Sequence, residues 1–384
     1  MQKHRSFYLL LDGKKVNLIN MEKNNKNKRV VVAMSGGIDS SVAAALLKEG
    51  LACPELGRRE VIGVFMKFWG GSTESEKRAR LVAKKLGISF YVFNFENDFK
   101  KKVVDYFLKD SKLGLTPNPC VVCNKEIKFG LLFKKLKSLK ADYITTGHYA
   151  RLKREIPNPK SQIPNYKYRL LKAKDKNKDQ SYFLWKLDQK ILKKTLFPIG
   201  DYTKPEIRNL AKKFKLSFED VAESQEICFV QTNIIDFLKK HLKTKPGLII
   251  TRPGLVLGQH QGLWFYTIGQ RKGIGLAGGK PYYVLDKDIK NNILIVTNNE
   301  KDLYKKELVV KNLNWISGKA PKFPLKAMVG IRYNHKPASA ILKNNKIVFL
   351  KSQKAVTPGQ SAVFYLPNGK AGKKGELLGG GIIV

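Results

Sequence analysis

The sequence predicts an α/β protein, in which a doubly wound parallel sheet is followed by two small β-rich modules. Between Arg29 and about Asn233, short apolar runs alternate with amphipathic stretches, which is the pattern of repeated strand–helix units. Beyond that point helices are expected to be few, and short strands separated by Gly and Pro follow. At 384 residues the chain is also longer than a single core usually supports, so two or three domains are expected.

Four parts are expected along the chain. The first is polar, carries an Asn/Lys run at Glu22–Lys28 and is predicted to be a disordered extension. Met21 is an alternative start, so the place of this extension in the native protein stays open. The predicted bounds are 1–28 for the extension, 29–236 for the α/β domain, 237–300 for a central β-rich domain and 301–384 for a C-terminal β-barrel.

Hydrophobic periodicity predicts the elements of the α/β domain in order. The expected strands are Val30–Ala33, Val61–Phe65, Phe90–Phe93 and Tyr143–Thr145. The expected helices are Ser40–Glu49, Glu76–Leu86, Phe99–Leu108 and Ile127–Leu139. A Pro/Asn/Lys-rich stretch, Lys153–Lys178, then carries half of a hairpin at Tyr166–Lys172, and strand-rich segments run over Gly247–Tyr283 and Leu308–Val384. In a doubly wound sheet the ligand binds beyond the carboxyl ends of the strands.

The chain is strongly basic, with 73 Lys and Arg against 31 Asp and Glu and a net charge of +42. This excess favours a polyanionic partner such as a nucleic acid, although a general bias toward lysine explains part of it. No apolar run approaches the ~18 residues of a membrane helix, and the N-terminus lacks the order of a secretory signal. Four cysteines are too few for a disulfide scaffold of this length. We therefore expect a cytoplasmic protein with no membrane association.

A glycine-rich loop, Met34–Ser41, directly follows the first strand and directly precedes a helix. Backbone N–H groups and the helix dipole bind phosphate at such a junction. Gly36 and Gly37 allow close approach of the backbone, and Asp39 is suited to Mg²⁺ held by the phosphates. The loop lacks the Lys of a Walker A sequence, so ordinary γ-phosphate transfer is not indicated. A plain glycine turn before a helix is the alternative.

Two thiols, Cys120 and Cys123, lie where the loop Thr116–Pro119 leads into a predicted helix. A helix N-terminus lowers the pKa of a thiol and favours the thiolate, so this is a position for reactive cysteines. A third thiol, Cys228, follows much later in the chain. Cys53 lies in an irregular loop and is expected to be an inert buried cysteine.

Six separated motifs carry a resemblance to a known family. Ser35–Ser40 resembles the PP-loop of the ATP pyrophosphatase superfamily, which alone leaves several synthetases and thiolases open. The full set resembles the tRNA-specific 2-thiouridylases and comprises Ser35–Ser40, Thr116–Phe129, Thr146–Arg151, Lys178–Leu184, Ala222–Phe229, and Gly258–Gly262 with Tyr266–Gly273. The resemblance covers nearly everything from Arg29 to the C-terminus.

The resemblance implies a PP-loop catalytic domain that uses ATP and Mg²⁺. The 2-oxo group of a wobble uridine attacks the α-phosphate, pyrophosphate leaves, and sulfur then displaces AMP to give 2-thiouridine. The cysteine matching Cys228 carries the sulfur as a persulfide, and the one matching Cys123 releases it and forms a disulfide. Many relatives carry Asp where this chain has Cys120, so the thiol is expected to take part in general acid–base work there.

The resemblance also implies ligand contacts and partners. The residues expected at ATP are Ala33, Met34, Ser35, Gly36, Gly37, Ile38, Asp39, Ser40, Met66 and Gly147. The target base is expected at Asn118, Pro119 and Cys120, and tRNA at His148, Lys178, Asp179, Gln180, Arg332, Tyr333 and Gln360. The expected partners of a monomeric chain are tRNAs for Lys, Glu and Gln, and a sulfur-relay protein or a cysteine desulfurase as persulfide donor.

Several alternatives stay open. Met66 is equally an ordinary core residue, and His148 a structural one. Cys120, Cys123 and Cys228 could hold a [4Fe–4S] cluster, as in related tRNA thiolases, or zinc with Cys53 as a fourth ligand. A non-catalytic RNA-binding relative and a small-molecule ligase are the other candidates. One departure from the family pattern is Arg78-Ala79-Arg80, where relatives usually have Asp-Ala-Arg, so a carboxylate is missing near the site.

Overall fold

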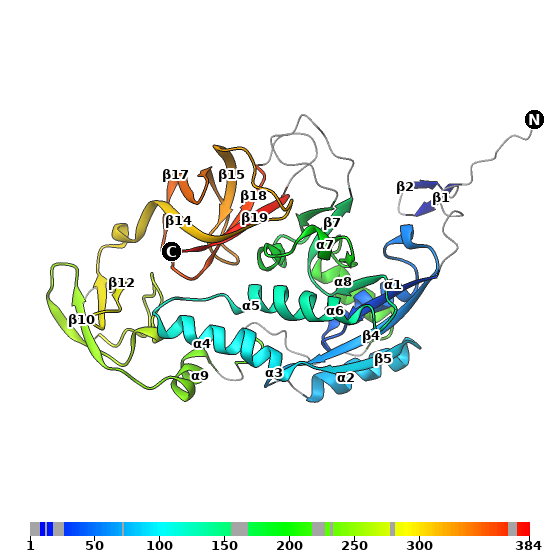
Figure 1. The fold of residues 1–384 in the computed structure, drawn as a ribbon, viewed down its shortest axis with the longest axis horizontal. Coiled ribbons are helices and arrows are strands. Elements are labelled where there is room, and N and C mark those ends of the chain that lie inside the picture. Colours follow the sequence, from blue (N-terminus) through cyan, green and yellow to red (C-terminus); the bar gives the residue numbers. More distant parts are fainter. Residues whose placement is uncertain are drawn as a thin grey trace, which may run out of the picture.

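The computed structural model describes residues 8–11, 14–17, 27–70, 73–154, 168–216, 227–230, 233–276, 281–367 and 375–384. Figure 1 shows a layered α/β domain (blue to green), a smaller sheet module that includes β10 and β12, and a barrel (orange to red) next to β7. The predicted fold class, a doubly wound parallel sheet followed by two β-rich modules, is confirmed.

The α/β domain is built on a five-stranded sheet with the order β5-β4-β3-β6-β9, and all of its pairings are parallel. The strands are β3 (Lys28–Ala33), β4 (Arg59–Lys67), β5 (Ser89–Asn94), β6 (Tyr143–Thr146) and β9 (Thr195–Leu196). Strand order reverses between β3 and β6, because β4 and β5 lie on one side of β3 and β6 and β9 on the other. The carboxyl ends of β3 and β6 therefore form the switch point at which such sheets bind ligands.

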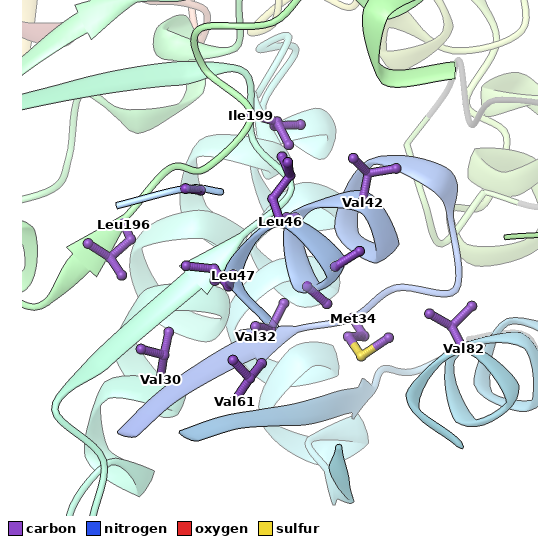
Figure 2. Packing of buried hydrophobic residues seen from close by; sticks show 14 of the residues in the cluster. Val30, Val32, Met34, Val42, Leu46, Leu47, Val61, Val82, Leu196 and Ile199 are labelled. Carbon is purple, nitrogen blue, oxygen red and sulfur yellow. The ribbon is translucent and has the colours of Figure 1, made fainter. Parts of the chain in front are cut away.

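One face of the sheet is covered by α1 (Ile38–Lys48), α2 (Thr73–Lys85) and α8 (Lys204–Lys213). Alternate residues of β3 point to the two faces, as in any strand. Val30, Val32 and Met34 join the cluster on the α1 face, where Figure 2 shows Val42, Leu46 and Leu47 packed onto them. Val31 and Ala33 enter the cluster on the other face.

Two interrupted helices lie on the second face. The first comprises α3 (Glu96–Phe99), the π-helical segment η3 (Lys100–Val104) and α4 (Asp105–Lys112). The second comprises α5 (Pro119–Val122), the π-helical segment η4 (Cys123–Leu131) and α6 (Leu132–Lys135). The prediction of a helix starting at Ile127 was wrong at its N-terminus. Asn118 caps the helix and Pro119 occupies its first turn, so both cysteines of this motif are already helical.

The barrel closes from β14 (Tyr304–Trp315), β15 (Leu325–Gly330), β16 (Ala338–Lys343), β17 (Lys346–Lys354), β18 (Ser361–Tyr365) and β19 (Leu377–Ile383). It packs on the α/β domain beside the antiparallel hairpin β7 (Ala150–Arg154) and β8 (Tyr168–Lys172). The indole of Trp185 donates to the Ser361 hydroxyl over 3.0 Å, and the Lys172 amide donates to the Gly375 carbonyl over 2.9 Å. Barrel residues accordingly share a hydrophobic cluster with the sheet domain.

The central module is a four-stranded sheet with the order β11-β10-β13-β12. Its strands are β10 (Gly247–Thr251), β11 (Val256–His260), β12 (Tyr283–Asp288) and β13 (Ile293–Thr297). Helix α9 (Ile234–His241) precedes it. The remaining short elements are η2 (Pro54–Leu56), η5 (Ser181–Leu184), α7 (Gln189–Leu192), η6 (Leu263–Phe265) and η7 (Glu300–Leu303).

The N-terminal extension differs in part from the expectation of disorder. Strands β1 (Tyr8–Leu11) and β2 (Lys14–Asn17) pair as an antiparallel hairpin, with Tyr8 opposite Asn17. An apolar run followed by Asp12-Gly13 is a typical hairpin signal in the sequence, and it explains this difference. The predicted extension ends at residue 28, but Lys28 is already the first residue of β3. Its remaining residues before Asn27 lie outside the described residues, as do Tyr166, Lys167 and most of the Pro/Asn/Lys-rich stretch. Within the described residues, no helix is long and apolar enough to span a bilayer.

Candidate active site

The glycine-rich loop connects β3 to the N-terminus of α1 at the switch point. Gly36 has φ +76°, and a Cβ there would lie 2.1 Å from the Ser75 carbonyl oxygen, so only glycine fits. The Ser35 amide donates to the Ser40 hydroxyl over 3.1 Å, which curls the loop over the helix start. Gly37 is the N-cap and contributes no side-chain cap. The first turn of α1 therefore presents backbone N–H groups to the space beyond the loop, where a phosphate binds favourably.

Asp39 accepts two hydrogen bonds at one carboxylate oxygen. The Lys204 ammonium donates to Oδ1 over 2.7 Å, and the Tyr149 hydroxyl donates to the same atom over 2.8 Å. Lys204 is only 5% exposed, although it lies in the first turn of α8, where the helix dipole disfavours a cation. A buried lysine beside a phosphate-binding loop is a functional candidate that the sequence reading missed. Its one sequence signal is a cation directly after the capping residue Thr203.

The turn after β6 joins this loop to the cysteine region. A Cβ on Gly147 would lie 2.6 Å from the Ser40 amide nitrogen, so glycine lets the turn pack directly on α1. His148 is buried, shares a 2.7 Å hydrogen bond with the Thr146 hydroxyl and packs against the ring of Phe129 in η4. Burial, and then the charge of Lys128, hold the pKa of His148 well below its usual value, so its ring is neutral. Its predicted contact with tRNA stays a prediction.

The structure brings the three motif cysteines together. Cys120 is the second residue of α5 and Cys123 the first of η4. The charge of Cys228 acts on the pKa of both thiols, after burial, so the three sulfur atoms lie within electrostatic reach. Phe229, the neighbour of Cys228, packs in the same aromatic cluster as Cys123. This packing anchors two segments that are far apart in the sequence. Residues Ala222–Glu226 of the third cysteine motif lie outside the described residues.

The expectation that the helix start favours thiolates was wrong. Burial raises the pKa of the Cys120 thiol to about 11, and it also raises the pKa of Cys123 and of Cys228. Desolvation outweighs the partial charge at the helix N-terminus for these thiols, and in the case of Cys123 it comes from the aromatic side chains of its hydrophobic cluster. The ammonium of Lys128 opposes this effect and lowers the pKa of all three thiols. Lys128 is thus a cation shared by the cysteines that the sequence reading did not single out.

The cysteines do not fit a metal centre. Among the described residues, no group of three or more His, Cys, Asp or Glu side chains could hold a metal ion. Cys53 packs against the cluster on the α1 face of the sheet, whereas Cys123 belongs to the cluster on the other face. Cys53 therefore cannot complete a zinc site with Cys120, Cys123 and Cys228. Burial raises the pKa of Cys53 to about 12, as expected for an inert thiol.

Residues predicted at the target base and at ATP lie around these centres. Asn118 and Pro119 are buried at the start of α5. Met66 is half-buried near the end of β4 and packs against the two clusters on the cysteine side, so its role as a core residue is visible and its contact with adenine stays a prediction. Arg78 donates to the Gly36 carbonyl over 3.2 Å. The departure from the family pattern therefore places a guanidinium, instead of a carboxylate, on the phosphate loop.

Most residues predicted to contact tRNA make contacts within the protein. Lys178 is half-buried beside Asp179, whose carboxylate accepts from the Ala173 amide over 3.0 Å, and Gln180 accepts from the Tyr149 amide over 3.0 Å. Arg332 donates to the Ile268 carbonyl over 2.9 Å, and Gln360 donates to the Thr116 carbonyl over 2.8 Å. The ring of Tyr333 lies 4.4 Å from that of Phe183, and burial, Asp179 and Cys120 raise the pKa of its hydroxyl. Tyr333 therefore reaches from the barrel toward the cysteines.

A parallel doubly wound domain with this loop at its switch point defines a nucleotide-binding protein of the PP-loop class. Family models match in the same order as the structural parts. They are described as tRNA methyl transferase HUP domain for residues 28–232, tRNA methyl transferase PRC-barrel domain for 235–298 and Aminomethyltransferase beta-barrel domain for 305–383.

Curated relatives match along nearly the whole chain. The tRNA-specific 2-thiouridylase MnmA of Clostridioides difficile is 42% identical, with 93% of this chain and 98% of the relative covered. That of Carboxydothermus hydrogenoformans is 44% identical, with 93% and 97% covered. This chain belongs to the tRNA-specific 2-thiouridylase family. Among solved structures, the match with the U34-tRNA thiolase NcsA from Methanococcus maripaludis with its [4Fe-4S] cluster is 19% identical. It covers 56% of this chain and 65% of the thiolase chain, with a TM-score of 0.33, which is too low for any conclusion about a cofactor.

Proposed function

We propose that this chain is an ATP-dependent tRNA uridine 2-sulfurtransferase, which adenylates the wobble uridine and then replaces its 2-oxo group with sulfur. The observation that carries the proposal is the joining of two centres. The loop at Gly36 and Gly37 and the thiols of Cys120, Cys123 and Cys228 are connected through the Gly147–His148 turn, which contacts α1 on one side and η4 on the other. A phosphate site and reactive sulfur within one region are what activation followed by sulfur transfer requires.

In the first step, the uridine O2 attacks the α-phosphorus of ATP, and the bond to the bridging oxygen breaks to release pyrophosphate. Adenylation turns a poor leaving group into a good one. The first turn of α1 and the ammonium of Lys204 are placed to stabilise the charge that develops on the phosphates. Asp39 is partly exposed, so its carboxylate suits Mg²⁺ carried by the nucleotide, and that ion supplies neutralisation of phosphate charge when bound.

In the second step, the outer sulfur of a Cys228 persulfide forms a bond to C2 of the uridine, and AMP leaves. The Cys123 thiol loses its proton and attacks the inner sulfur of Cys228, so the sulfur–sulfur bond of the persulfide breaks and a Cys123–Cys228 disulfide forms. The transferred sulfur is reduced while the two cysteines are oxidised, and a thiol reductant restores them. Cys120 is the thiol nearest to the predicted base residues Asn118 and Pro119 in the chain and is assigned the proton transfer at the base.

The partners follow from the family and from the charge. A net charge of +42 suits the phosphate backbone of tRNA, and the isoacceptors proposed are those for Lys, Glu and Gln. A sulfur-relay protein or a cysteine desulfurase supplies the persulfide. Cys228 is exposed, which allows loading by such a donor protein, whereas Cys123 is buried.

Mass spectrometry of tRNA nucleosides tests the proposal. The protein is incubated with tRNA, ATP, Mg²⁺ and a persulfide donor, and 2-thiouridine is expected at the wobble position. Cys228→Ser should abolish the sulfur product while pyrophosphate release that depends on tRNA persists. Binding of tRNA with no new nucleoside and no pyrophosphate would support a non-catalytic relative.

A further inference from the structure

We call the segment Gly114–Asn118 the leader segment and the interrupted helix α5–η4–α6 (Pro119–Lys135) the cysteine helix. The leader segment joins α4 to the cysteine helix, and residues of the two β modules contact it. The Thr116 amide donates to the barrel carbonyl of Pro358 over 3.0 Å. The Gln360 amide of the barrel donates back to the Thr116 carbonyl over 2.8 Å. A Cβ on Gly359, whose φ is +91°, would lie 2.9 Å from the Thr116 nitrogen. The barrel thus makes two hydrogen bonds to the leader segment, and its backbone at Gly359 lies in close contact with Thr116.

The central module holds the same segment from another side. The Lys287 ammonium donates to the Gly114 carbonyl over 2.9 Å, and the Thr267 hydroxyl lies 3.5 Å from that of Thr116. Burial lowers the pKa of Lys287 to about 8, so this contact is sheltered from water. Gly114 has φ +74°, and a Cβ there would lie 2.1 Å from the side chain of Ile289. A second module therefore fixes the opposite end of the leader segment.

The two β modules are also tied to each other beside the leader segment. Arg332 of the barrel donates to the Ile268 carbonyl of the central module over 2.9 Å and to the Thr357 hydroxyl over 2.7 Å. A Cβ on Gly269 would lie 2.5 Å from that of Ala355, so the central module and the barrel are in direct contact there. The modules consequently act on the leader segment together. The barrel is strongly basic, with 16 Lys and Arg against 3 Asp and Glu in residues 301–384, so it suits a polyanionic partner.

The other end of the leader segment is the start of the cysteine helix. Asn118 caps this helix, and Cys120 is its second residue. Tyr182 donates to the barrel carbonyl of Ser361 over 2.8 Å, and the Asn118 side chain lies close enough to lower the pKa of the Tyr182 hydroxyl, which burial raises. A movement of the β modules would therefore displace the leader segment, the capping residue Asn118 and the thiols of Cys120 and Cys123 that follow it.

We propose that the leader segment couples tRNA binding on the β modules to the placement of Cys120 and Cys123, with Gln360 and Lys287 as the positioning residues. The inference rests on the proposed function, and it gives Gln360 a role other than the direct tRNA contact that the sequence resemblance implied. Bound tRNA in this account orders the cysteine helix for the chemical steps, in addition to the affinity that the basic residues provide.

Steady-state kinetics with Gln360→Leu and Lys287→Met test the coupling in the full-length protein. Each variant should lower kcat for 2-thiouridine formation at least tenfold, while the KM for tRNA stays within twofold of the wild type. Lys287→Arg, which keeps a donor, should restore most of kcat. Lys84→Met removes the same charge from an exposed position of α2, outside the two β modules, and should leave kcat unchanged. A raised KM with an unchanged kcat in Gln360→Leu would overturn the coupling and identify a direct tRNA contact.

A second readout does not depend on turnover. The rate at which iodoacetamide labels Cys120 and Cys123 is followed by mass spectrometry with and without tRNA. In the wild type, tRNA should change this rate at least threefold, and in Gln360→Leu and Lys287→Met the change should disappear. The double variant should lose no more than either single one, because both contacts act through one segment. Equal tRNA effects on labelling in all variants would contradict the coupling. If the wild type forms no 2-thiouridine, the proposed function fails, whereas labelling still decides the coupling.

Discussion

At the scale of single residues, the pairing of Asp39 with Lys204 decides how the phosphate loop is charged before ATP binds. The ammonium is buried and lies 2.7 Å from the carboxylate, so each charge offsets the desolvation cost of the other. When Mg²⁺ and phosphates arrive, they compete for the same two groups. We expect Lys204 then to turn from the carboxylate to the phosphate oxygens.

Replacement of Lys204 by Met should reduce tRNA-dependent pyrophosphate release by about a hundredfold, the usual effect of losing one preorganised charge at a transition state. Lys204→Arg should retain part of the activity, because it keeps the cation. Release of radiolabelled pyrophosphate at saturating tRNA measures the effect. A rate unchanged in Lys204→Met would show that the ammonium only supports the fold. Asp39→Ala, the companion variant, should lose pyrophosphate release and sulfur transfer together.

The thiols set a pH dependence of their own. Cys228 is exposed at the protein surface, yet nearby protein atoms desolvate its thiolate and raise its pKa above the ordinary value of 9.0. The thiolate is therefore a minor form at neutral pH and increases about tenfold with each pH unit. The rate of alkylation of Cys228 by iodoacetamide should therefore rise steadily from pH 7 to pH 9, without a plateau. A plateau below pH 8 would mean that the pKa of Cys228 is lowered instead of raised and would contradict the account.

The cation of Lys128 is the second part of this dependence. It lowers the pKa of Cys228, so Lys128→Met should slow alkylation at a given pH several-fold, because a smaller fraction of the Cys228 thiol is then ionised. Lys125→Met is a matched control in the same segment, because Lys125 instead faces Asp188 at 3.7 Å. Equal rates in Lys128→Met and Lys125→Met would remove Lys128 from the account.

At the scale of elements, the cysteine helix shows a clear difference between the predicted and the observed start of a helix. The apolar periodicity of Ile127–Leu139 indicated the second half of this helix, whereas the helix predicted from periodicity did not include the first half, Pro119–Glu126. Its signals were in the sequence, since Asn118 is a good N-cap and Pro119 suits the first turn. The π-helical segment η4 had no sequence signal that periodicity could detect, because it shifts the register of side chains away from the α-helical spacing.

The cap of this helix can be tested by two substitutions. Asn118→Ala removes the acceptor for the Val121 amide, which lies at 3.4 Å, and should lower the free energy of unfolding by about 1 kcal/mol. Asn118→Asp keeps the acceptor and should preserve stability, yet its negative charge should raise the thiol pKa values and slow sulfur transfer. Chemical denaturation and single-turnover thiolation separate the two effects. Equal loss of stability in both variants would contradict the capping role.

Strands β3, β4, β5 and β6 were predicted with errors of only a few residues, as the pairs Val30–Ala33 with β3 and Phe90–Phe93 with β5 illustrate, whereas the two-residue strand β9 was not predicted. Buried parallel strands are continuous apolar runs between turn signals, so composition alone indicates them. The ion pair of Asp39 with Lys204 was not predictable in the same way. It joins residues on α1 and α8, and only the packing of these helices on one face of the sheet makes them neighbours.

At the scale of the whole molecule, three parts of the chain converge on the helix that begins at Pro119. The sheet domain supplies the phosphate loop, the central module and the barrel grip the leader segment, and the segment around Phe229 brings Cys228 to Cys123. The sequence motifs predicted which residues matter, but they gave no indication that Arg332 and Gln360 join domains. Such contacts depend on how complete domains dock, and local patterns carry no information about docking.

The most direct test of the account is a single turnover in the absence of reductant. Protein carrying a persulfide on Cys228 is mixed with tRNA, ATP and Mg²⁺, and 2-thiouridine and cysteine disulfides are both quantified by mass spectrometry. Cys123 lies in the aromatic cluster with Phe229, the neighbour of Cys228, and should form one Cys123–Cys228 disulfide for each 2-thiouridine. Formation of 2-thiouridine with both cysteines still reduced, or with a disulfide to Cys120 instead, would contradict the assignment of Cys123 as the resolving thiol.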